Sequence, residues 1–348
     1  MVIEIARRSM FRMPATLTLF VLVASILVAC ANADEGDEES SGSLVVYSGR
    51  SETLVGPIIE QFEEVTGIDV SVKYGGTSAI AATLLEEGSN TPADVFFAQD
   101  PGGLGAVKQM LSDLPDDLLE IVPSWARSTE GKWVGISGRA RVIIFNTDNL
   151  SQDDIPSSIS GFTDSKWKGR IGWAPGNASF QTMVTAMRVL WGEDKTMEWL
   201  QGIQANEPKA YPKNTPAVAA TAAGEIDVAF VNHYYLYRFI QEDGEDFAAR
   251  NYNLTEGGPG SLIMVAGAGI LETSENKDNA EKFLRFMLST VAQQYFTGQT
   301  YEYPLVDGVN TNRLLTPLDE LNNPQIDMAS LGDIQGTQSL LRELGILQ

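Results

Sequence analysis

Residues 44–74, LVVYSGRSETLVGPIIEQFEEVTGIDVSVKY, decide the fold class of this chain. Residues 44–48 form an apolar strand pattern, and residues 54–66 follow with apolar side chains at helical spacing. Gly67 stands where a helix usually ends in a left-handed cap. Residues 68–74 then alternate between apolar and polar side chains, as a half-buried strand does. A strand, a helix and a strand joined by short loops indicate an open α/β sheet with parallel neighbours.

The same strand and helix patterns continue along the chain in two sets. Two wholly apolar segments, 142–145 and 262–266, lie at the two ends of the second set. Continuous apolar runs of this length predict fully buried strands, and their positions predict a pair of crossover strands between two lobes. The expected first lobe comprises residues 44–141 and 267–310, and the expected second lobe comprises residues 142–266 and 311–348.

The first 30 residues have the layout of a secretory signal, with arginines at the start followed by an apolar run at residues 15–29. This run is shorter than the ~20 residues that a membrane span needs. The ending Leu-Val-Ala-Cys resembles a bacterial lipobox, in which Cys30 is lipidated and becomes the first mature residue. The alternative is a signal peptide cleaved nearby, with Cys30 discarded or free. We expect a signal peptide at residues 1–29, then a flexible acidic tether from lipidated Cys30 to residue 43. The expected product is an extracytoplasmic lipoprotein, in the periplasm or on the cell surface, held to the membrane through this anchor only.

Composition excludes several classes of function. The chain has 348 residues, 43% of them hydrophobic and 20% charged, which is typical of a globular protein. Its net charge of -22 argues against nucleic-acid binding, which needs a basic face. A single Cys excludes a disulfide framework and a multi-thiolate metal site. A single His, His233, excludes multi-histidine zinc sites and leaves a Ser-His-Asp triad only one possible base.

Tyr234 and Tyr235 follow the buried strand pattern at residues 226–231 after Asn232 and His233. Ligands of open α/β sheets bind beyond the carboxyl ends of the strands, so these side chains are candidates for a site. Two phenols at one point suit a hard trivalent cation, because its charge drives each phenol, with a free pKa of about 10, to the phenolate. The alternative is that the two tyrosines begin a helix and pack as ordinary aromatics, which is the more frequent use of such a pair taken alone.

Five segments, read together, resemble the signatures of the ferric-iron-binding substrate-binding proteins of bacterial ABC transporters. They are residues 46–50 (VYSGR), 92–96 (PADVF), 138–142 (GRARV), 167–172 (WKGRIG) and 224–235 (GEIDVAFVNHYY). The resemblance implies the type II periplasmic-binding-protein fold, with two α/β lobes joined by two hinge strands. It also implies the function, which is to capture Fe³⁺ in the cleft between the lobes and deliver it to an ABC permease without catalysing a reaction. We expect such a protein to act as a monomer.

The resemblance implies that Tyr234 and Tyr235 are the paired tyrosines that bind the iron. In the family a synergistic anion, such as carbonate, phosphate or citrate, completes the iron shell. The positions that resemble its binding site are Asn177, Ala178, Ser179 and Asn214, with Arg139 and Arg141 as further candidates for anion contact or charge balance. Backbone N–H groups at a helix start form a ready anion site, which supports this assignment. The alternatives are helix capping for Asn177 and Ser179 and structural ion pairing for the arginines.

The chain also departs from the family pattern. Many members have a His after the first strand and a Glu after the Asp-Val-Phe strand, whereas this chain has Ser51 and Gln99 at those cleft positions. Neither is a strong iron ligand, and His233 is better suited to a supporting hydrogen bond than to ligation. We therefore expect two tyrosines plus exogenous anions to hold the iron, either bare or as a chelate. Iron should load on the second lobe first, leave the protein partly open, and depend strongly on the anion.

Two rival functions belong to other classes. Binding proteins of the same fold take thiamine, phosphonate, sulfate or polyamines. A hydrolytic enzyme could use His233 beside Tyr234 as base and nucleophile, but the sequence has no nucleophile elbow and no second His. Tyrosinate–iron charge transfer gives a reddish to orange colour, which distinguishes an iron binder from both rivals.

Overall fold

The computed structural model describes residues 42–348. The predicted signal peptide, Cys30 and nearly all of the predicted tether lie outside the described residues. Among the helices of residues 42–348, none combines the length and the hydropathy that a membrane span requires.

A mixed β-sheet runs through the described residues. Its strands are β1 (Ser43–Ser48), β2 (Asp69–Tyr74), β3 (Val95–Ala98), β4 (Val134–Asn146), β5 (Ile171–Trp173), β6 (Lys209–Ala210), β7 (Val228–Asn232), β8 (Ala249–Tyr252) and β9 (Ile263–Ile270). The strand order is β2-β1-β3-β9-β4-β7-β5-β6, and β8 pairs with β4. Strands β1, β2 and β3 pair in parallel, as do β5, β6 and β7, whereas β4 and β9 pair antiparallel to each other and to their neighbours.

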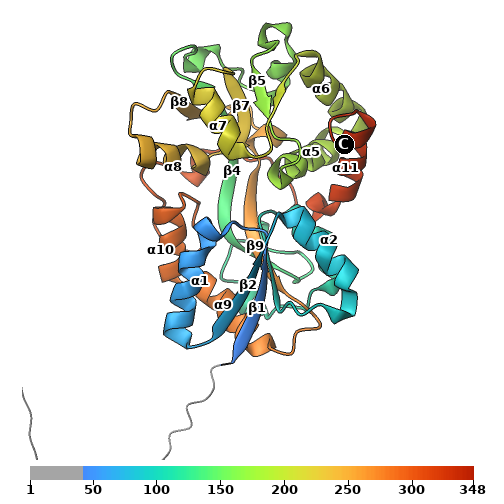
Figure 1. The fold of residues 1–348 in the computed structure, drawn as a ribbon, viewed down its shortest axis with the longest axis vertical. Coiled ribbons are helices and arrows are strands. Elements are labelled where there is room, and N and C mark those ends of the chain that lie inside the picture. Colours follow the sequence, from blue (N-terminus) through green and yellow to red (C-terminus); the bar gives the residue numbers. More distant parts are fainter. Residues whose placement is uncertain (1–41) are drawn as a thin grey trace, which may run out of the picture. The chain divides into compact units, whose positions relative to one another are not determined.

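Helices lie on either side of the strands (Figure 1). They are α1 (Glu52–Thr66), α2 (Thr77–Glu87), α3 (Pro101–Ala106), α4 (Asp116–Leu119), α5 (Ala178–Trp191), α6 (Glu193–Ala205), α7 (Asn214–Ala222), α8 (Tyr234–Asp243), α9 (Lys277–Met287), α10 (Thr290–Gln299) and α11 (Ile334–Glu343). The predicted first helix is confirmed, and it ends at Gly67, whose φ of 67° places it in the left-handed region.

Strands β4 and β9 connect two groups of elements, one around β1 and one around β7 (Figure 1). Residues 134–140 of β4 pair with β9, and residues 141–145 pair with β7. β4 is therefore longer than the apolar pattern at residues 142–145 predicts. The pattern stops early because Arg139 and Arg141 interrupt it, although both side chains are buried. Burying two arginines inside a central strand costs free energy. The polar site next to β4, described below, accounts for their presence.

The sheet around β7 is covered on both faces. Side chains of β4 and β7 alternate between two apolar clusters, because successive residues of a strand point to opposite faces. One cluster contains Ile143, Phe145, Val228 and Phe230 and packs against α5 and α6. The other contains Val142, Ile144, Ala229 and Val231 and packs against α7 and α8. Because apolar clusters cover both faces of this sheet, the polar side chains lie at the ends of the strands.

Candidate functional site

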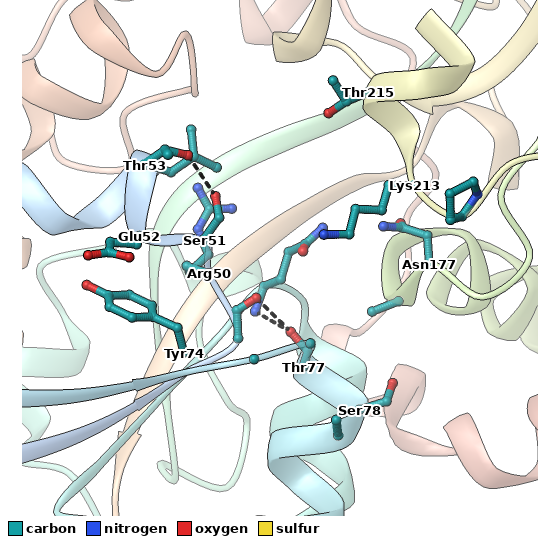
Figure 2. A pocket seen from close by; sticks show the side chains of 18 of the residues that line it. Arg50, Ser51, Glu52, Thr53, Tyr74, Thr77, Ser78, Asn177, Lys213 and Thr215 are labelled. Carbon is teal, nitrogen blue, oxygen red and sulfur yellow. Dashed lines mark hydrogen bonds between the residues drawn. The ribbon is translucent and has the colours of Figure 1, made fainter.

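A cavity of about 880 Å³ lies at the ends of the strands. Its lining comes almost wholly from segments that follow a strand or open a helix, as expected for ligand sites of open α/β sheets. The β1 side of the cavity consists of Gly49, Arg50, Ser51, Glu52, Thr53, Leu54, Tyr74, Gly75, Gly76, Thr77, Ser78, Ala79 and Gln99. The β7 side consists of Gly176, Asn177, Ala178, Pro212, Lys213, Thr215, Tyr234, Tyr235 and Arg238. Figure 2 shows Arg50, Ser51 and Thr53 across the cavity from Asn177 and Lys213.

The two tyrosines lie in the first turn of α8. Strand β7 ends at Asn232, so Tyr234 and Tyr235 are released from the alternation of the strand. Their rings stack with centroids 4.3 Å apart and an interplanar angle of 29°. Both residues line the cavity, and both also belong to the first turn of α8. A place at a binding site and a place at the start of a packed helix are therefore compatible.

The two phenols are enclosed by protein, and this environment disfavours the charged form of Tyr235. Tyr234 is fully buried, and its hydroxyl has no hydrogen-bond partner among the described residues. Burial raises the pKa of Tyr235 well above 10, and the neighbouring Tyr234 raises it further, while Arg50 and Arg139 lower it. An unpartnered buried hydroxyl costs free energy, so this arrangement fits a ligand that is bound through the phenol oxygens.

Arg139 and Arg141 lie on β4, outside the lining of the cavity and fully buried. Arg139 donates from Nη1 to Ser179 Oγ at 3.2 Å, and Arg141 donates from Nη1 to Asn232 Oδ1 at 2.9 Å. The Nε atoms of both arginines and Nη2 of Arg141 have no partner among the described residues. Burial lowers the pKa of Arg141 to about 9, against the favourable influence of the two tyrosines.

None of the ion pairs within residues 42–348 includes Arg139 or Arg141. Structural ion pairing, the alternative role of these two arginines, is therefore not observed. Buried Asp100 interacts electrostatically with Arg139 without forming an ion pair, and a bound anion would offset the remaining cost of burying the two guanidinium groups. The buried positive charges of Arg139 and Arg141 thus favour a negatively charged ligand at this site.

The predicted anion-binding residues at the start of α5 differ in whether they line the cavity. Asn177 and Ala178 line the cavity, and Asn177 also caps α5 by accepting a hydrogen bond from Ser179 N at 3.0 Å. Ser179 is fully buried and does not line the cavity. Its hydroxyl oxygen lies 3.0 Å from Gln99 Nε2, 3.2 Å from Arg139 Nη1 and 3.2 Å from Asn232 Nδ2. In this structure Ser179 therefore organises its neighbours and does not face the cavity.

Asn214 begins α7 and is also fully buried. Neither Nδ2 nor Oδ1 of its side-chain amide has a partner among the described residues. A buried amide with two unpaired atoms fits a polar ligand or a bound water. Asn214 is not among the lining residues, but Lys213 and Thr215 on either side of it are.

The two cleft residues on the β1 side differ in exposure. Ser51 is exposed, and its hydroxyl lies 3.3 Å from Thr53 Oγ1 (Figure 2). Gln99 is half-buried and donates to Ser179 on the β7 side, so it connects the two sides of the cavity. Neither side chain supplies a charged ligand.

His233 lies behind the lining of the cavity, and both of its ring nitrogens contact the backbone. Its Nδ1 accepts from Ala140 N at 3.1 Å, and its Nε2 lies 2.7 Å from Tyr301 O. Because a carbonyl oxygen only accepts, Nε2 carries the hydrogen and the ring is neutral. Burial lowers the pKa of His233 to about 4. With both nitrogens held by the backbone, the imidazole is not free to act as the base that a hydrolytic enzyme would need.

Sequence reasoning overlooked several charged residues at the cavity. Arg50, Lys213 and Arg238 line it, and Glu52 is its one lining carboxylate. Lys213 points into the cavity (Figure 2). The signal that could have found them is position, since Arg50 lies two residues after β1 and Lys213 directly precedes α7. Cationic side chains outnumber carboxylates among the charged lining residues, which is unexpected in a chain with a net charge of -22 and favours an anionic ligand or complex.

Within residues 42–348, no group of three or more His, Cys, Asp or Glu side chains could hold a metal ion. A hard cation at this cavity would therefore depend on phenol oxygens, on the single carboxylate of Glu52 and on ligands from solution. Phenolate, carboxylate and phosphate oxygens are ligands of the same hard class.

Comparison with known proteins gives concordant matches. Residues 57–319 match the family of bacterial extracellular solute-binding proteins. The major ferric iron-binding protein of Neisseria meningitidis serogroup A is 32% identical over 94% of this chain and 98% of its own length. Iron-bound HitA from Pseudomonas aeruginosa superposes with a TM-score of 0.83 at 32% identity, covering 87% of this chain and 99% of HitA. Trichodesmium IdiA (FutA), solved with iron and citrate ligands, gives a TM-score of 0.76 at 26% identity, covering 88% of this chain and 100% of that one.

Proposed function

Because this chain belongs to the family of bacterial extracellular solute-binding proteins, we propose that it captures Fe³⁺ with a synergistic anion in the cavity at Tyr234 and Tyr235. The predicted family resemblance and the predicted fold class are confirmed by relatives that match nearly the whole chain. Those relatives include a ferric iron-binding protein and two proteins solved with iron. The family is one of binding proteins rather than enzymes.

The observation that carries this proposal is the pairing of stacked phenols with buried, unpaired guanidinium groups. The hydroxyl of Tyr234 and the Nε atoms of Arg139 and Arg141 all lack partners among the described residues. A ferric ion bound by two phenolates would engage the phenol oxygens, and an anion beside it would offset the buried charge of the arginines behind the lining. An uncharged organic solute would leave the arginines without compensation.

In this proposal Tyr234 and Tyr235 bind the iron as phenolates, and the positive charge of the metal offsets the cost of removing their protons. The anion lies against Asn177 and Ala178, at the start of α5, where backbone N–H groups and the helix dipole favour negative charge. Ser179, Asn214, Arg139 and Arg141 support this region from behind the lining, and Ser51 and Gln99 complete the opposite side. Carbonate, phosphate and citrate are the anions proposed.

The remaining proposals concern the whole protein. The two lobes predicted from sequence, residues 44–141 with 267–310 and residues 142–266 with 311–348, would close over the cargo by rotation about β4 and β9. Gln99 would then act at closure, because it bonds to Ser179 across the cavity. A monomer anchored through lipidated Cys30 would pass the iron to an ABC permease at the membrane. The extracellular character of the family supports an extracytoplasmic location.

The test of the proposed function is the tyrosinate–iron colour. Purified wild-type protein with Fe³⁺ and citrate should develop a visible charge-transfer band and bind iron tightly. The double variant Tyr234→Phe with Tyr235→Phe should lose both, while Tyr252→Phe, which changes a half-buried tyrosine on β8, should retain them. A double variant that keeps the band would refute the assignment, and a wild-type protein that binds thiamine without colour would favour the organic-solute alternative.

A further inference from the structure

Arg50 is a buried arginine at the cavity that the proposed function does not yet use. It lies in the loop between β1 and α1, is only 1% exposed and lines the cavity (Figure 2). Its Nη2 forms an ion pair with Glu302 Oε1. Its Nε and Nη1 have no partner among the described residues. Two donor atoms of a fixed guanidinium are therefore free next to the proposed iron site.

Glu302 holds this guanidinium from the opposite direction. It is fully buried, its Oε1 accepts from Arg50, and its Oε2 accepts from Ser137 Oγ. Ser137 lies on β4, where the register with β9 shifts. Because both carboxylate oxygens of Glu302 accept hydrogen bonds, this side chain has little freedom to move. Glu302 therefore fixes the orientation of the planar guanidinium of Arg50.

The backbone around Glu302 is itself fixed. Tyr301 adopts a φ of 56°, which is uncommon for a residue other than glycine, and its carbonyl oxygen is bonded to His233. Glu302 N donates to Phe296 O at 3.0 Å, and Tyr303 pairs with Gly138 of β4. The segment after α10 is thus attached to β4 and to the residue preceding Tyr234, so Glu302 approaches Arg50 from a defined position.

Arg50 lines the same cavity as Tyr234 and Tyr235. Its guanidinium interacts electrostatically with Tyr234, Tyr235 and Glu302. A buried ion pair contributes little net stability, because desolvation offsets the attraction of the charges. The ion pair can nevertheless orient the guanidinium of Arg50, because orienting a group requires no gain in stability. In this orientation Nε and Nη1 are available to a ligand.

We propose that Arg50 binds the anion that accompanies the iron, donating from Nε and Nη1 to its oxygens, and that Glu302 is the residue that positions it. The inference rests on the proposed function and adds a β1-side contact to an anion site otherwise built from β4 and the β7 side. The ligand class is an oxyanion with at least two acceptor oxygens, such as a carboxylate chelator or phosphate. Arg50 would therefore discriminate between oxyanions and ligands that offer one acceptor or none.

The experiment measures the dissociation constants of citrate and of inorganic phosphate for the iron-loaded full chain, by titrating the visible band. Arg50→Gln should weaken binding of both anions about tenfold to a hundredfold, because hydrogen bonds to a charged donor are lost. Arg50→Lys should restore only part of the affinity, since an ammonium lacks the fork of a guanidinium. Arg285→Gln, which changes an arginine paired with Asp117 and Glu281 away from the cavity, should match wild type.

Glu302 is tested through its dependence on Arg50. Glu302→Gln should weaken anion binding in the wild-type background but cause no further loss when added to Arg50→Gln, because it acts only by positioning Arg50. The double variant also removes both charges of the buried pair, so it keeps the test possible if Arg50→Gln alone fails to fold. If the double variant binds citrate as wild type does, the inference is wrong. If the wild-type protein shows no iron band at all, the proposed function fails and this inference with it.

Discussion

The two sides of the cavity differ in the chemistry they present. The β7 side contributes both phenols and the capped start of α5, and Arg139 and Arg141 lie behind the lining on β4. The β1 side contributes an exposed hydroxyl at Ser51, an amide at Gln99 and the guanidinium of Arg50. One side presents two stacked phenols beside a helix start, whereas the other presents the single phenol of Tyr74 and exposed Glu52 among groups that only donate or accept hydrogen bonds. The difference indicates that metal affinity and anion recognition are separable.

The largest expected effect tests whether metal affinity belongs to the β7 side. Tyr235→Phe should weaken ferric binding by more than about a hundredfold, because a direct ligand is worth more than its supporting contacts. Ser51→Ala should change the affinity less than about threefold, since the hydroxyl is exposed and contacts only Thr53. Competition with a chelator of known affinity measures both variants. Equal losses in the two variants would contradict the asymmetry between the sides.

The second prediction concerns the stability of the β7 side in acid. The pKa of His233 is lowered to about 4 by burial, from an ordinary value near 6.5. Below pH 6.5 the unfolded chain binds a proton that the folded chain excludes, so stability falls as pH decreases from about 6.5 to 4. The loss attributable to this group approaches about 3 kcal/mol, at 1.36 kcal/mol per pKa unit.

Denaturant unfolding of the iron-free protein at several pH values measures this effect. His233→Gln removes the titrating group, and its stability should therefore decline less steeply between pH 6.5 and 4 than that of wild type. The decline that remains in the variant reports the carboxylates. Parallel stability curves for the two proteins would show that His233 does not carry the dependence.

The third prediction tests the separation of anion recognition from metal affinity. Arg141→Gln should weaken citrate or phosphate binding about tenfold to a hundredfold, because the buried guanidinium has no carboxylate partner to share its charge. The visible band of the iron complex should persist at saturating anion, because both phenols remain. Arg170→Gln, which changes an arginine paired with Asp227, is the matched control. Loss of the band at every anion concentration would mean that the two functions are not separable.

The smallest expected effect adds a charged ligand to the weaker side. Gln99→Glu places a carboxylate at a half-buried position that lines the cavity. It should tighten ferric binding about tenfold and reduce its dependence on added citrate, since an internal oxygen ligand replaces one from solution. Gln99→Ala serves as the control, because it removes the bond to Ser179 without adding charge. Iron binding that stays fully dependent on citrate in Gln99→Glu would show that position 99 cannot reach the metal.

Sequence reasoning identified the α/β class, and it selected Tyr234, Tyr235 and Asn177, which line the cavity, although their roles in binding stay predictions. Strand ends are local features, and residues that follow parallel strands collect at one edge of a sheet. Sequence reasoning could not give the direction of the His233 imidazole, which turns to Ala140 and Tyr301. Position after a strand indicates where a backbone lies, but the direction of a side chain depends on partners from elsewhere in the chain.

The sequence by itself determined the alternation of strands and helices and the release of Tyr234 and Tyr235 at the end of β7, because hydrophobic periodicity acts over a few residues. Only the tertiary structure decided which polar groups remain free at the cavity. Arg50 and Glu302 are 252 positions apart, and Gln99 and Ser179 are 80 apart, so no local pattern indicates that they meet. The availability of a buried donor depends on every group packed around it, and that environment exists only once the chain is folded.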